Sequence, residues 1–255
     1  MLWYKSWLDT RWRFLIGLAL LMCSAAGTVL EYPRVAALLP LVHPAPGSGT
    51  VARQIQEVVE LSRDYRGYVW AQAFRQNLPQ MATLFAVLLG IESLWAHSSR
   101  SATRFMLSLP VSRRRLLGVR AATGLGELFA ITILPPLVVP LISPVIGSAY
   151  GVGAALAHGL CLFAACAVFF ALALLLSTRF ADVWRPLLIA CAIAVALSLA
   201  GFAAGDLSHY SIFYLMTGES YFRTGNMPWL GLLTSAAASA ALMYAAGVSI
   251  SRRDF

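Results

Sequence analysis

Long apolar runs separated by short polar stretches dominate the pattern of the chain. A membrane-spanning helix needs about 20 mostly apolar residues. We interpret charge-poor runs of this length as spans and place their ends at glycine, proline or aromatic clusters. Six spans follow, over residues 14–30, 78–97, 116–137, 153–176, 186–205 and 228–250. The pattern therefore predicts an all-α integral membrane protein whose single transmembrane domain covers residues 1–255.

The segment before the first span is rich in aromatic and basic residues. Trp3, Trp7 and Trp12 alternate with Lys5 and Arg11, a composition typical of a helix lying in the membrane interface. Residues 1–13 are therefore predicted to form an interfacial helix before the chain turns to cross. A cleaved secretory signal is the alternative, because basic residues precede an apolar run here.

The one long polar segment, residues 31–77, separates the first two spans. Prolines and glycines open it and mark a loop. From Val51 onward, Ile55, Val58 and Val59 follow helical spacing among charged residues, which predicts an amphipathic helix. This helix either covers a transport path or rests on the lipid headgroups.

Composition and charge fix the class and the orientation. Apolar residues make up 59% of the chain and charged residues 12%, about half of the roughly 25% usual in globular proteins. Basic residues favour the cytoplasmic side of short loops, so we expect both termini in the cytosol and the net charge of +8 on the inner face. Anionic lipid and partner proteins explain that charge, and no nucleic acid is expected. With this orientation, thirteen of the 19 basic residues are cytosolic: Lys5, Arg11, Arg13, Arg100, Arg104, Arg113, Arg114, Arg115, Arg120, Arg179, Arg185, Arg252 and Arg253.

Motifs for catalysis, metal binding or nucleotide binding are absent from the sequence. It contains no G-x-x-x-x-G-K-[ST] loop, no H-E-x-x-H pair and no G-x-S-x-G elbow. The four cysteines fall inside predicted spans without a C-x-x-C pair, and are interpreted as small packing residues. We therefore expect a non-catalytic chain without a cofactor or metal of its own.

Two acids, Glu92 and Glu127, lie inside predicted spans, where an ionisable group is costly. Both lie nearer the cytosolic side than the midplane, and Arg120 stands about 10 Å along the helix from Glu127. One interpretation is an interhelical ion pair or hydrogen bond that holds the second and third spans together. The other is a direct role in the passage of substrate or protons.

A basic segment broken by proline joins the second and third spans. Its apolar part suits a partner groove, Pro110 limits helix on its N-terminal side, and Ser112 is placed to cap a span beginning at Arg113. Three arginines before a span are by themselves only a topology signal, but that explanation leaves the apolar part unexplained. The candidate contact residues are Leu107, Leu109, Pro110, Val111, Ser112, Arg113, Arg114 and Arg115.

The order of these features resembles the permease subunit of an ABC exporter of the ABC-2 type. The string Leu107-Ser-Leu-Pro-Val-Ser-Arg113 and the ending Ser251-Arg-Arg-Asp-Phe255 carry the resemblance, which covers essentially the whole chain. It implies that residues 107–115 form a coupling helix docking on a separate ATPase subunit that binds ATP and Mg²⁺. It also implies a second permease copy, identical or related, and a place in the bacterial cytoplasmic membrane.

Two other functions stay open at this stage. A transporter driven by an ion gradient would use Glu92 and Glu127 as proton carriers, although the internal repeats common in such proteins are not visible. An intramembrane enzyme would use Glu92, His97 or His158, but no motif supports it.

Overall fold

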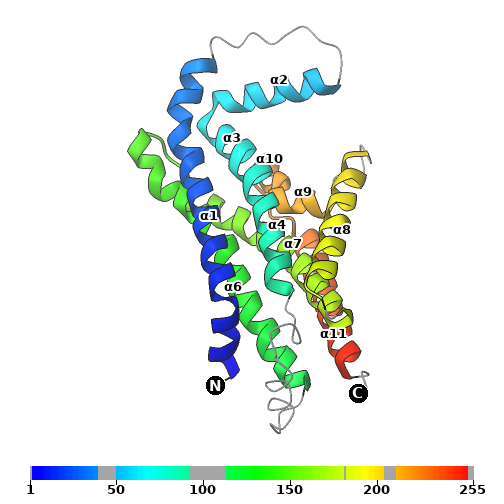
Figure 1. The fold of residues 1–255 in the computed structure, drawn as a ribbon. Coiled ribbons are helices and arrows are strands. Elements are labelled where there is room, and N and C mark those ends of the chain that lie inside the picture. Colours follow the sequence, from blue (N-terminus) through cyan, green and yellow to red (C-terminus); the bar gives the residue numbers. More distant parts are fainter. Residues whose placement is uncertain (1, 40–49, 92–112, 181, 204–210, 252–255) are drawn as a thin grey trace.

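The computed structural model describes residues 2–39, 50–91, 113–180, 182–203 and 211–251. The regular structure in these ranges is helical throughout, which confirms the predicted all-α class (Figure 1). Five helices are long and apolar enough to cross a membrane. They are α1 (Leu2–Leu38), α6 (Arg113–Ile142), α7 (Val152–Arg179), α8 (Trp184–Ala203) and α11 (Trp229–Ser251).

These five helices correspond to five of the six predicted spans within a few residues, and their length and composition are those expected of a helical membrane protein. The second predicted span, residues 78–97, is described only as far as Ile91, where α4 (Leu78–Gly90) has just ended. The beginnings of α1 and α6 and the end of α11 lie at the same end of the bundle, and α4 runs towards that end (Figure 1).

Helix α1 is continuous, whereas the sequence predicts an interfacial helix that turns at residue 13. No proline lies near that position, and Thr10 Oγ1 stays 3.1 Å from the carbonyl oxygen of Ser6 one turn earlier, as in an unbroken helix. Gly17 does not bend the helix; it makes room for the ring of Phe85 on α4. The first predicted span therefore continues past residue 30 to Leu38.

A helix of changing pitch leads into the second predicted span. Helix α2 (Thr50–Arg63), which the spacing from Val51 predicts, runs across the end of the bundle (Figure 1). The chain then passes through α3 (Tyr65–Val69), the π-helix η2 (Trp70–Asn77) and α4 without a break. Pro79 explains the wide turn, because its ring would clash with the carbonyl four residues earlier in a regular α-helix.

The proline-rich end of the third predicted span remains helical further than predicted. Helix α6 continues through Pro135, Pro136 and Pro140 to Ile142. The 3₁₀ turn η3 (Ser143–Ile146) follows, and Gly147 ends it with a left-handed φ of 72°. Burial among neighbouring helices stabilises the proline-containing turns that a sequence pattern treats as an exit from the membrane.

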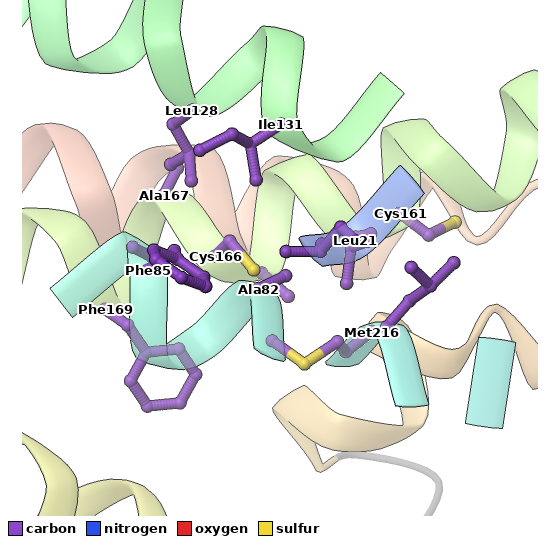
Figure 2. Close-up of a cluster of buried hydrophobic side chains, with 14 of the residues drawn as sticks. Leu21, Ala82, Phe85, Leu128, Ile131, Cys161, Cys166, Ala167, Phe169 and Met216 are labelled. Atoms are coloured by element: carbon purple, nitrogen blue, oxygen red, sulfur yellow. The ribbon is translucent and has the colours of Figure 1, made fainter. Parts of the chain in front are cut away.

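Helix α7 lies at the centre of the bundle and packs on α4, α6 and α11. Small residues bring these backbones together, as is usual between membrane helices. A Cβ at Gly90 of α4 would lie 2.5 Å from the carbonyl oxygen of Phe170, and one at Gly159 of α7 would lie 3.1 Å from that of Thr132. Figure 2 shows Cys161 and Cys166 of α7 in the resulting core, which confirms that these two cysteines are packing residues.

Two short helices occupy the polar segment before the last predicted span. Helices α9 (Ile212–Thr217) and α10 (Glu219–Thr224) form a hairpin around Gly218, whose φ is 61°. The sequence predicts a hairpin over residues 206–226, and the described part has this form. Helix α9 packs on α7, and Met216 is buried in the core shown in Figure 2.

Candidate functional site

The helices that flank the predicted coupling segment are described, while Glu92 and residues 107–112 lie outside the described residues. Helix α6 begins at Arg113, where the sequence predicts its start, and Arg115 in its first turn is exposed. Helix α4 runs towards the same end of the bundle and stops short of it (Figure 1). We call this end, where α1 and α6 begin and α11 ends, the coupling end.

Glu127 ties α6 to α1 below the coupling end. Its carboxyl group is buried, with 4% of the residue exposed, and its Oε1 accepts a short hydrogen bond from the hydroxyl of Thr10. The sequence predicts an interhelical bond for this acid, but towards the second span. The partner lies on α1 instead, because α1 packs along the face of α6 that carries Glu127.

Arg13 makes the corresponding connection between α1 and α4. Its guanidinium group donates to the carbonyl oxygens of Leu88 at 3.2 Å and Ile91 at 2.9 Å. Leu88 and Ile91 lie at the C-terminal end of α4 as the structure describes it, so a positive charge there complements the helix dipole. Helix α1 is therefore bonded to both helices that flank the coupling segment.

The surroundings of Glu127 are polar but incompletely satisfied. Arg120, two turns along α6, lies close enough to interact electrostatically with Glu127 and with Asp9 of α1. Among the described residues, neither Glu127 Oε2 nor Ser6 Oγ has a hydrogen-bond partner. Most buried polar atoms have a hydrogen-bond partner, so the unsatisfied oxygen of Glu127 makes this contact a candidate functional position.

Aromatic residues hold the α9–α10 hairpin at the opposite half of the bundle. Trp70 of η2 is fully buried, donates its indole N–H to the carbonyl of Thr217 at 3.1 Å, and stacks on Phe222 with ring centres 4.4 Å apart. A π-helix often marks a functional position, and here it turns Trp70 towards the hairpin. The sequence analysis does not identify this contact.

His158 of α7 lies beneath the same hairpin and is 1% exposed. It stacks on Phe74 at 4.5 Å and meets the edge of Tyr221 at 5.6 Å. Neither ring nitrogen makes a hydrogen bond of good geometry in the described part of the chain, although the backbone of Thr217 interacts with the ring. The ring contacts of His158 in the described part of the chain are thus aromatic.

An exposed ion-pair network links the hairpin to α2. Arg223 of α10 donates to Glu57 at 3.1 Å and to Glu219 at 2.7 Å, and Arg75 of η2 approaches Glu57 at 3.8 Å. The hydrogen bond to Glu219 raises the pKa of Arg223, which keeps this group charged. Exposed pairs contribute little each, about 0–1 kcal/mol, so the network orients α10 more than it stabilises the fold.

The described residues contain no candidate metal site, because no three His, Cys, Asp or Glu side chains among them lie close enough together to bind an ion. Comparison with known proteins adds no assignment, since no family model, no curated protein and no solved structure matches the chain.

Proposed function

We propose that the chain is the membrane-spanning permease subunit of an ATP-driven exporter of the ABC-2 type. Six spans cross the bacterial cytoplasmic membrane, and both termini and residues 98–115 face the cytosol. The chain itself hydrolyses nothing. A separate ATPase subunit binds ATP and Mg²⁺, and a second permease copy, identical or related, completes the path.

The observation that carries this proposal is the bonding of α1 to both helices beside the coupling segment. A push on residues 107–115 reaches α6 directly and α4 through the preceding segment. The Arg13 bonds and the contact between Thr10 and Glu127 pass this displacement on to α1. Three helices then respond together to a partner at the coupling end, as ATP-driven opening of a path requires.

Purification of the tagged chain from its own membranes in mild detergent tests the proposal. We expect an ATPase subunit to co-purify and the fraction to hydrolyse ATP. The triple variant Arg113→Ala/Arg114→Ala/Arg115→Ala loses the subunit, because the cations that anchor the segment are gone.

A matched variant, Arg34→Ala/Arg63→Ala, removes exposed charge elsewhere on the chain and retains the subunit. If the wild-type chain never retains an ATPase, or if the triple variant retains as much as the wild type, the proposal is wrong.

A transporter driven by an ion gradient is the second candidate, and one observation favours it. Glu127 is buried and has one oxygen without a partner among the described residues, an arrangement suited to binding a proton. With Glu92, it would then carry protons across. Transport in vesicles that continues without ATP and stops when the proton gradient is collapsed identifies this function in place of the first.

A further inference from the structure

A half-open apolar hollow of about 270 Å³ lies between α6, α7 and α11. Gly118 and Ala121 of α6 line one side, Leu174 of α7 forms the floor, and Tyr244 and Gly247 of α11 line the other side. Helices α6 and α11 both pack along α7 and touch each other less, so a groove remains over α7. Tyr244 is 77% exposed, which shows that the groove opens to the surroundings of the bundle.

The shape of the groove suits a flexible hydrocarbon chain. A Cβ placed at Gly118 or at Gly247 would meet no atom within 4 Å, so the two glycines leave real space instead of permitting a close helix contact. The volume is slightly below the roughly 300–1,000 Å³ of pockets for compact small molecules. The described lining residues carry no charge.

Basic residues lie on the lining helices beyond one end of this groove. Helix α6 begins with three arginines a few residues before the lining position Leu117, and α7 ends at Arg179 just beyond Leu174. In the sequence, Arg252 and Arg253 follow α11 directly. Two of the three lining helices, α6 and α7, thus have described basic residues towards one end of the groove, and basic pockets between membrane helices are where anionic lipid headgroups bind.

We propose that this groove is a binding site for one anionic phospholipid. An acyl chain lies along Gly118, Leu174 and Gly247, and the headgroup phosphate is bound by arginines at the mouth, including Arg115 and Arg179. Both arginines also interact within the chain, but a guanidinium group has five N–H donors and serves a phosphate as well. The site is independent of the proposed transport function.

Native mass spectrometry tests the site on the full chain released from nanodiscs of phosphatidylglycerol, of phosphatidylcholine, or of an equal mixture. We expect the wild type to retain phosphatidylglycerol in preference to phosphatidylcholine. Gly118→Leu/Gly247→Leu fills the groove and lowers retention of phosphatidylglycerol about tenfold, as expected when roughly two methylene groups lose their burial.

Gly126→Leu is the matched control. Gly126 is exposed on the same helix, also has no atom within 4 Å of its added Cβ, and does not line the groove, so retention should match that of the wild type. A second variant, Arg115→Gln/Arg179→Gln, leaves the groove open and reduces the preference for the anionic lipid. It tests the site even if the doubly filled variant does not fold.

Three results would overturn the proposal. They are equal retention of the two lipids by the wild type, unchanged retention in the filled variant, and an unchanged preference in the arginine variant. A change from dimer to monomer in the filled variant, with lipid retention intact, identifies a second copy of the chain as the occupant and also overturns it.

Discussion

Replacing Thr10 by Val removes the hydroxyl that bonds α1 to Glu127 while keeping the size of the side chain. Glu127 is buried and its other oxygen already has no partner in the described part of the chain, so Thr10→Val leaves the carboxyl group without the bond that satisfies it. An unsatisfied buried group costs about 1–3 kcal/mol in protein interiors, while interhelical bonds in membranes average about 0.6 and reach about 1.7 kcal/mol. We expect a loss of about 1–2 kcal/mol.

The double variant Thr10→Val/Glu127→Met separates this bond from general packing. Replacing both partners by apolar groups of similar shape is often nearly neutral, so most of the stability lost in Thr10→Val should return. Unfolding of the wild type, Thr10→Val, Glu127→Met and the double variant in mixed detergent micelles, followed by circular dichroism, gives the coupling energy between the two positions.

Thr123→Val is the control for the loss of a hydroxyl from a membrane helix. The Thr123 hydroxyl donates to the carbonyl of Val119 in its own helix, at 2.9 Å, so we expect a change below about 0.5 kcal/mol. A coupling energy indistinguishable from zero, or equal losses in Thr10→Val and Thr123→Val, would refute the role assigned to the bond between Thr10 and Glu127.

Two further predictions concern the other half of the bundle. Gly218 and Gly225 have φ of 61° and 72°, but an added Cβ overlaps the ring of His158 only at Gly218. Gly225→Ala should therefore cost about 1–2 kcal/mol of folding stability, and Gly218→Ala about 1–3 kcal/mol more. Thermal unfolding measures both variants, and equal shifts in Tm would contradict the contact with His158. Burial raises the pKa of Tyr65 above its ordinary value of 10.0 despite a 2.5 Å hydrogen bond to Ser143. The folded state therefore binds this proton more tightly, and stability is lost as pH rises above that value. Measured by denaturation at several alkaline pH values, Tyr65→Phe should weaken this loss, and an unchanged pH dependence would contradict the assignment.

The spans could be predicted because the length and low charge of a membrane helix are visible in its own segment of the sequence. Length and low charge identify α6, α7, α8 and α11 without knowledge of their neighbours. The helical spacing after Val51 likewise predicts α2 from one segment alone.

Contacts between helices could not be predicted in the same way. Thr10 and Glu127 are 117 residues apart, and the packing of α1 on α6 decides that they meet. The burial cost of an acid identifies Glu127 as a position that needs a partner, but it does not identify the partner. The contact between Trp70 and Thr217 could not be predicted for the same reason, because it depends on the π-helical turn before Pro79 and on the position of the hairpin.

A photoreactive amino acid at Val111 tests the central claim most directly. Illumination of intact membranes should attach the chain to a nucleotide-binding subunit, identified by mass spectrometry of the adduct. The same group at Val58, exposed on α2, should attach no such subunit. If Val111 yields no adduct with an ATPase, or if Val58 yields the same adduct, the proposal that residues 107–115 contact an ATPase subunit is wrong.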